Sequence, residues 1–259
     1  MSAGESAEEV ARSDDRRRTQ SEEHGHDRKT LQFGVVTASS PENERVVFGF
    51  RVYGVEEPRR RRGIQLAFGL VLFAVAMSLM VEARLGVSPW TSFHQGTADA
   101  FNVSFGTTVV VVGALLLALF RPLKEPLGFG TLANVFLVGP MIDLVLWSIP
   151  EWETLWWRVP ALLISPILLG LATGLYIGAG LGTGPRDGMM TAIARRGVKV
   201  SYARWSLEIA ALTIGWILGG DIGLGTVWFA FMIGWCVRVF LPRFTIGQLT
   251  DSASTGDST

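Results

Sequence analysis

The sequence lacks most of the residues that build metal or disulfide-bonded sites. A single cysteine, Cys236, excludes an internal disulfide, and there are only three histidines and no CxxC pair, which argues against zinc or iron–sulfur sites. His24 and His26 form an isolated pair, typical of a solvated segment. The formal net charge is zero, so no overall basic surface favours nucleic acid. We predict no metal, no cofactor and no nucleic-acid partner.

Charged residues are scarce over most of the chain and concentrated at its start. Residues 1–62 contain 12 Lys/Arg and 12 Asp/Glu, whereas the remaining 197 residues contain 11 of each. The first 45 residues have no hydrophobic period, so residues 1–62 are predicted to form a disordered cytoplasmic tail and residues 242–259 a second disordered tail. The apolar patch Val46–Tyr53 is too short to cross a bilayer, and we interpret it as linker, with a short strand or an interfacial contact as the alternatives.

Long apolar runs fill the rest of the chain. A helix needs roughly 17 to 25 mostly apolar residues to cross a bilayer. The run Thr107–Phe120 has no charge and no water-facing stripe, which excludes a helix of a soluble domain. The sequence predicts an all-α membrane protein with six spans, at about 63–83, 104–120, 128–148, 159–182, 204–220 and 225–241.

Basic residues crowd alternate connections between these spans. The first span follows Arg59–Arg62, the second is followed by Arg121 and Lys124, and the fourth is followed by five basic residues between positions 186 and 204. The other connections are poor in Lys and Arg. By the positive-inside rule, the chain is a multi-pass protein of the cell membrane with both termini in the cytoplasm.

An internal repeat divides the apolar region. LGVSPW at 85–90 matches LGTGPR at 181–186, and GFGT at 128–131 matches GLGT at 223–226, with offsets of 96 and 95 residues. The two repeats, 63–148 and 159–241, each carry three spans. Because three is odd, the second copy is predicted to lie upside down relative to the first.

Each repeat also contains a short segment led by proline. Ser88–Phe101 and Gly184–Gly197 are too short to cross. Pro89 and Pro185 suit the first position of a helix, with Ser88 or Gly184 as the N-cap. Such helices either lie on the membrane surface or re-enter the bilayer as half-helices. In the second case the free amides at their N-termini could hold an anionic group. The sequence leaves both arrangements open.

Small residues recur on one face of the fourth span. They are spaced by four residues, which lets helix backbones approach closely in lipid. We predict a helix-packing stripe, with a backbone-lined solute path as the alternative. Whether the stripe packs within one chain or between copies stays open, so self-association is one expected interaction besides the lipid bilayer. The stripe consists of Gly170, Gly174, Gly178 and Gly182.

Ionisable residues within the spans are candidates for function, because burying a charge in the bilayer costs at least about 2.5 kcal/mol. Asp143 has no local basic partner and is an ion-coupling candidate. Glu208 is a second one, although Arg204 lies one turn earlier and an i,i+4 ion pair is the structural alternative. Arg238 lies near the end of its span and is expected to snorkel. Asn134 is expected to hydrogen-bond across the bundle.

Two motifs resemble those of a known family. LGVSPWTSFHQG at 85–96 and TGLYIGAGLGTGPRDGMMTAIARR at 173–196 are similar to motifs of the YczE/YyaS/YitT family of bacterial integral membrane proteins. The resemblance covers about residues 60–242. Family members usually have Asp after SPW, where this chain has Thr91, and Asp187 is the repeat-equivalent residue. The resemblance implies a multi-pass membrane protein.

Two functions follow from these patterns. The first is a secondary transporter or permease of unknown substrate, in which Trp90, His94, Arg186 and Asp187 contact the substrate or gate its path. The alternative is a non-transporting membrane partner or regulator of a neighbouring enzyme system, with the basic cytoplasmic loop docking a protein partner. No HExxH, GxSxG or paired-carboxylate pattern occurs, so we do not expect an enzyme.

Overall fold

The computed structural model describes residues 44–47, 50–53 and 59–246. The His24/His26 pair and most of both predicted tails lie outside these residues. Strands β1 (Glu44–Val47) and β2 (Phe50–Tyr53) form an antiparallel pair in which Val47 lies opposite Phe50. The patch 46–53, which we interpreted as linker, therefore contributes to two short strands, as one of the two alternatives predicts. The described part of the chain is all-helical only from residue 59 onward.

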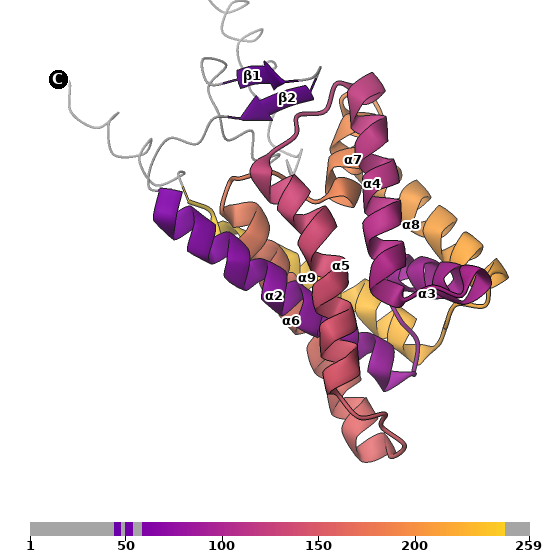
Figure 1. Ribbon diagram of the computed structural model, residues 1–259. Coiled ribbons are helices and arrows are strands. Elements are labelled where there is room, and N and C mark those ends of the chain that lie inside the picture. The colour runs from indigo at the N-terminus through magenta and orange to yellow at the C-terminus, as the bar shows by residue number, and fades with distance from the viewer. Residues whose placement is uncertain (1–43, 48–49, 54–58, 247–259) are drawn as a thin grey trace, which may run out of the picture. The chain divides into compact units, whose positions relative to one another are not determined.

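Residues 59–246 form eight helices (Figure 1). Six are long and match the predicted spans to within a few residues, and two short ones are the predicted proline-led helices. The helices are α2 (Arg59–Ala83), α3 (Pro89–Phe101), α4 (Phe105–Leu123), α5 (Phe129–Ser148), α6 (Leu155–Gly178), α7 (Pro185–Ala194), α8 (Val200–Ile217) and α9 (Leu224–Phe244).

Helix ends differ from the prediction for local reasons. α2 begins at Arg59, since the four arginines assigned to the tail form its first turn. α6 ends at Gly178 and not at 182, because Gly180 and Gly182 have φ values of +66° and +124°, which end a right-handed helix. Ser88 caps α3 by accepting a hydrogen bond from the backbone N–H of Thr91 at 3.2 Å, as the sequence predicts.

Helices α2, α4, α5, α6 and α9 are long and apolar enough to cross a membrane. α8, the fifth of the six predicted spans, does not meet the same criteria, and it carries Arg204 and Glu208. Large apolar side chains face outward on the long helices, among them Trp147 with 86% of its surface exposed and Phe231 with 77%. Such surfaces need an apolar solvent, so the chain is a multi-pass membrane protein.

Two hydrogen bonds between a loop and a helix join equivalent positions of the two repeats. The donors are 95 residues apart and the acceptors 96. The backbone N–H of Gly225 donates to the carbonyl of Leu85 at 2.9 Å, and that of Gly130 donates to the carbonyl of Leu181 at 2.7 Å. Each short helix is therefore tied, through the loop before it, to the first turn of α9 or of α5. Both loops turn at a glycine next to the accepting leucine, Gly86 (φ +105°) or Gly182 (φ +124°).

Three glycines of the predicted stripe, Gly170, Gly174 and Gly178, lie against α9 of the same chain, whereas Gly182 lies beyond the end of α6, against Gly128 and Thr131, and is not part of the stripe. A methyl group on Gly170 would overlap Cys236, and methyl groups on Gly174 and Gly178 would crowd the Phe240 and Phe244 backbones. α2 packs on α5 in the equivalent way, and its Ser78 hydroxyl lies 3.4 Å from the Ile142 carbonyl. Small residues thus bring both helix pairs to close backbone contact within one copy.

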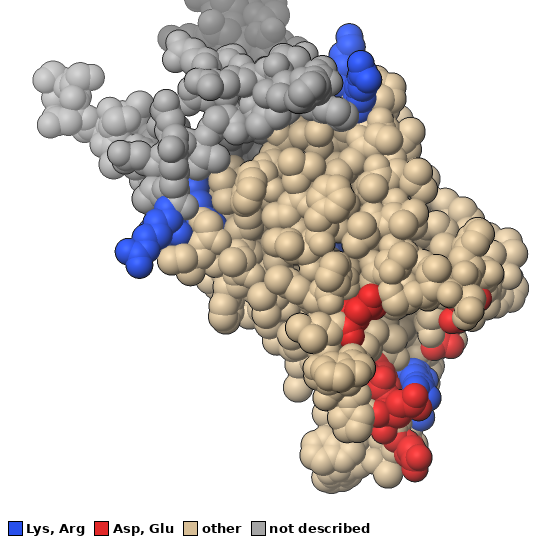
Figure 2. Space-filling view, in the orientation of Figure 1, with Lys and Arg blue, Asp and Glu red and all other residues tan. Residues whose placement is uncertain are grey.

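Charge is distributed unevenly between the two ends of the helical region. Figure 2 shows Lys and Arg where α2 begins and α4 ends, and most of the visible Asp and Glu at the opposite end, where α5 leads into α6. The acidic end includes an exposed ion pair between Arg84 and Glu151 at 3.0 Å. The two ends are separated by the apolar length of the long helices.

Candidate functional site

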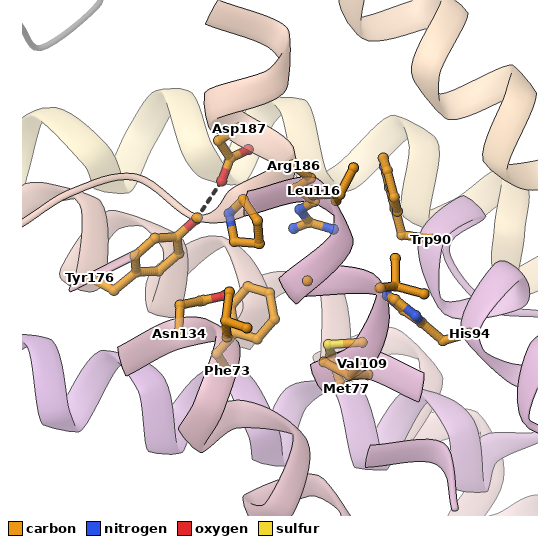
Figure 3. Close-up of a pocket in the computed structure, with 15 residues that line it drawn as sticks. Phe73, Met77, Trp90, His94, Val109, Leu116, Asn134, Tyr176, Arg186 and Asp187 are labelled. Carbon is orange, nitrogen blue, oxygen red and sulfur yellow. Dashed lines mark hydrogen bonds between the residues drawn. The ribbon is translucent and has the colours of Figure 1, made fainter. Parts of the chain in front are cut away.

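A cavity of about 50 Å³ lies among helices α2 to α7, beside the middle of α2 and of α4 (Figure 3). The first turns of α3 and α7 both line it. Trp90 and Arg186 are repeat-equivalent, 96 residues apart, and each follows the proline that opens its short helix. All four residues predicted to contact a substrate, which also include His94 and Asp187, line this one cavity.

Helix α3 contributes two buried polar rings. Trp90 and His94 retain 8% and 7% of their surface, whereas Phe101 at the end of the same helix is 72% exposed. Within residues 59–246, Nε1 of Trp90 and Nδ1 of His94 have no hydrogen-bond partner. An unpaired buried polar atom costs free energy, so a hydrogen-bond partner at either atom would stabilise the structure.

Helix α7 contributes a cation and an anion with different neighbours. The carboxylate of Asp187 accepts a hydrogen bond from the hydroxyl of Tyr176. The guanidinium of Arg186 lies over the ring of Phe73, 5.5 Å from its centroid. No hydrogen bond or ion pair of this guanidinium occurs in the described part of the chain. In Figure 3 Arg186 points into the cavity between Trp90 and Tyr176.

The remaining wall is mostly apolar. Asn134, which the sequence assigned to structural hydrogen bonding, is a polar member of this wall. Tyr176 and Phe73 were missed, although Tyr176 is the one tyrosine inside a predicted span, a signal that the sequence offered. The apolar lining consists of Phe73, Met77, Val109, Val112, Leu116 and Val135.

The two ion-coupling candidates do not line the cavity. The carboxylate of Asp143 accepts hydrogen bonds from the Ser104 hydroxyl and the Gly106 backbone N–H, both at 2.6 Å. It thereby stabilises the N-terminus of α4, where negative charge is favourable. Glu208 pairs with Arg204 at 2.9 Å, as the structural alternative for this residue predicts. These contacts give both carboxylates a structural role.

A pair of polar contacts ties each short helix to the loop after α8 or α4. Gln95 of α3 donates to the Asp221 carboxylate at 2.9 Å, and Thr191 of α7 donates to the Glu125 carboxylate at 2.7 Å. The two contacts join repeat-equivalent positions, each 96 residues apart. Arg195 adds an ion pair to Glu125 at 3.3 Å. We call these contacts the Asp221 tie and the Glu125 tie.

Burial makes Glu125 unusual among the charged loop residues. It keeps 4% of its surface, and burial raises the pKa of its carboxyl group, against the opposing effects of the Thr191 hydrogen bond and of Arg195. No motif or spacing in the sequence singled out Glu125. Across the described ranges, no group of three or more His, Cys, Asp or Glu side chains is arranged to hold a metal ion.

Comparisons with known proteins place the helical region in a family. The family of unknown function DUF6198 matches residues 60–242. An uncharacterized protein of Haemophilus influenzae is 36% identical over 177 residues, which cover 68% of this chain and 81% of the relative. The uncharacterized membrane protein YczE of Bacillus subtilis is 33% identical over 180 residues, which cover 68% and 83%. The uncharacterized protein YyaS of the same organism is 26% identical over 181 residues, which cover 67% and 89%.

No solved structure matches the chain. The matched family region coincides with helices α2 to α9 and contains both motifs that carry the resemblance. The similarity to YczE and YyaS agrees with that resemblance. The chain therefore belongs to the family DUF6198.

Proposed function

We propose that this chain is a membrane carrier of a small solute, built from two inverted halves of three spans each. The observation that carries the proposal is the meeting of the first turns of α3 and α7 at one cavity that contains ionisable residues. Charged side chains placed beside the middle of long apolar helices are costly and are typical of solute paths. Repeat-related helix ends around a central site are common in secondary transporters.

Three finer features belong to the same proposal. α8 also crosses the membrane, which brings the number of spans to six, and its Arg204–Glu208 ion pair lowers the cost of burying both charges. α3 and α7 are half-helices that enter the bilayer from opposite sides, which the burial of Trp90 and His94 supports. The basic end shown in Figure 2 faces the cytoplasm together with both termini.

Alternating access follows from the paired ties. The Asp221 tie closes one end of the short-helix pair and the Glu125 tie closes the other. Release of one tie at a time opens the cavity to one side while the other side stays closed. Under this proposal the solute crosses the membrane without chemical change, and the chain is not an enzyme.

Transport is tested in vesicles that contain the purified full chain. Labelled acetate, glycine, methylammonium and glucose are supplied outside, and uptake is measured. We expect uptake of at least one of these solutes. Uptake should be lost in Arg186→Ala and Asp187→Asn and kept in Arg121→Gln, which removes an exposed arginine outside the cavity. Unchanged uptake in both cavity variants would remove these residues from the mechanism.

Access to the cavity is a test that needs no known solute. Val109→Cys, made in a Cys236→Ala chain, places one thiol on the cavity wall. A carrier exposes this thiol in turn to an impermeant thiol reagent on either side of the membrane. A thiol that reacts from neither side, together with no uptake of the four solutes, would contradict the carrier. A stoichiometric protein that co-purifies in mild detergent would then favour the regulatory partner.

A further inference from the structure

The polar groups of the cavity are predominantly hydrogen-bond donors. The guanidinium of Arg186 carries five N–H donors and no acceptor, and the indole of Trp90 carries one donor and no acceptor. Neither group has a hydrogen-bond partner among the residues from 59 to 246. Trp90 is 92% buried, since it keeps 8% of its surface, and its indole nitrogen is among the buried polar atoms without a hydrogen-bond partner. Both donors need an acceptor from outside the chain.

The one carboxylate in the cavity already has a donor. Asp187 accepts from the Tyr176 hydroxyl, on the side of the cavity away from Trp90 (Figure 3). Arg186 extends between the two, with Phe73 beneath its guanidinium. The cation is therefore open to a ligand on its Trp90 side. The nearby negative charge of Asp187 disfavours a ligand with two negative charges.

The size of the cavity and the chemistry of its wall further restrict the class of ligand. A volume of about 50 Å³ is room for about four water molecules. The lining also includes Met77, Val109 and Leu116, which offer no hydrogen bond to a polar tail. A planar carboxylate fits the fork of a guanidinium, and a short alkyl group fits the apolar wall.

We propose that the cavity binds a small monocarboxylate, held by the guanidinium of Arg186 and the indole N–H of Trp90, with its alkyl end against α2 and α4. The inference rests on the proposed function, because it names the solute class of the same cavity. Its test measures binding alone, so it can fail while the carrier stands.

The test uses the full chain in lipid nanodiscs and isothermal titration calorimetry. Sodium acetate is compared with acetamide, a neutral molecule of nearly the same shape, and with methylammonium chloride, at one constant chloride concentration. We expect saturable binding of acetate and at least about tenfold weaker binding of acetamide, since hydrogen bonds to a charged group are the stronger ones. Equal binding of acetate and acetamide, or tighter binding of methylammonium, would overturn the inference.

Variants locate the site. Arg186→Gln should weaken acetate binding at least about tenfold, and Trp90→Phe, which keeps an aromatic ring but removes the donor, about tenfold. Arg186→Lys should bind with intermediate affinity, because it keeps the charge and loses the fork. Arg121→Gln is the control and should bind as the unmodified chain does. Wild-type acetate affinity in Arg186→Gln would contradict the assignment.

The two proposals fail in distinguishable ways. If Arg186→Gln does not fold, the comparison of acetate with acetamide on the unmodified chain still decides the inference. If acetate binds but the cavity is accessible from neither side of the membrane, the carboxylate-binding site stands and the carrier proposal is rejected. If the cavity is accessible from both sides but acetate does not bind, the carrier proposal stands and the monocarboxylate assignment is rejected.

Discussion

The short helix of the first half, α3, lies with its backbone against α8, whereas a phenyl ring stands between α4 and α7, the short helix of the second half. Methyl groups on Gly215 and Gly220 would overlap the backbone of Ser92 and Phe93. At the position equivalent to Gly215, 95 residues earlier, α4 has Phe120, whose ring lies against Gly188 of α7. The cavity lies beside this wider contact.

The two halves share the contacts that hold the helices together and differ in the residues that line the cavity. The loop-to-helix hydrogen bonds, the turning glycines and the ties occur in both halves, so the framework needs them twice. The first turns of the short helices differ, with Trp90 and Thr91 in one half and Arg186 and Asp187 in the other. Both ionisable residues of these first turns therefore come from the second half, while α3 supplies buried rings.

The largest expected effect comes from the ring that distinguishes the halves. Phe120 is fully buried and packs with Val135 and Met189. Phe120→Ala should destabilise the fold by about 3 to 5 kcal/mol, because it leaves a cavity between α4 and α7. The measurement is the apparent Tm in mild detergent.

The matched control for this ring is Phe101→Ala, since Phe101 is 72% exposed. It should change the apparent Tm little. Similar losses in Phe120→Ala and Phe101→Ala would show that the ring does not hold α7 in place.

A second pair of variants compares equivalent glycines. A methyl group on Gly139 of α5 would overlap the carbonyl oxygen of Gly106, whereas one on Gly234 of α9 meets no atom of residues 59–246 within 4 Å. Gly139→Ala should destabilise by about 1 to 3 kcal/mol through overpacking. Gly234→Ala should be neutral or stabilise by up to about 1 kcal/mol through helix propensity. Equal losses of apparent Tm would show that α8 packs on α9 as closely as α4 packs on α5.

The smallest effect concerns the Glu125 tie and depends on pH. Burial raises the pKa of Glu125 above its ordinary value of 4.5, so the fold favours the protonated form. The stability contributed by this group is fully present below pH 4.5 and is lost as the pH rises through the raised pKa. As the pH rises from 4.5 through the raised pKa of Glu125, the apparent Tm of Glu125→Gln should therefore fall less steeply than that of the unmodified chain.

Glu151→Gln is the control for this pH dependence, because it removes a carboxylate whose side chain is 76% exposed. It should follow the unmodified chain at each pH. A Glu125→Gln curve parallel to that of the unmodified chain would contradict the role given to burial.

Local signals in the sequence predicted most of the fold. Apolar length located the long helices, and Ser88 with Pro89 located the start of α3, because both signals act within one turn or one span. The turns at Gly86 and Gly182 were not predicted, and Gly182 was assigned to the fourth span, because the period of four residues that it shares with Gly170, Gly174 and Gly178 continues past the end of α6. Helix ends shifted by up to four residues where arginines joined the first turn of α2.

The site was predicted only in part, because its contacts join distant segments. Trp90, His94, Arg186 and Asp187 were named from their motifs, and the cavity contains all four. The hydrogen bond between Tyr176 and Asp187 crosses the reversal between α6 and α7, which no helical period reveals. Asp143 lacks a local basic partner in sequence, but its acceptor role at the start of α4 depends on packing.

Labelling of two exposed residues tests the central claim, that the two halves cross the membrane in opposite directions around one cavity. Asp99→Cys and Lys199→Cys are each made in a Cys236→Ala chain and treated in intact cells with an impermeant maleimide. We predict that only the thiol at position 99 reacts from outside and that the thiol at position 199 reacts only after the cells are opened. Reaction of both thiols from the same side would contradict the inverted halves.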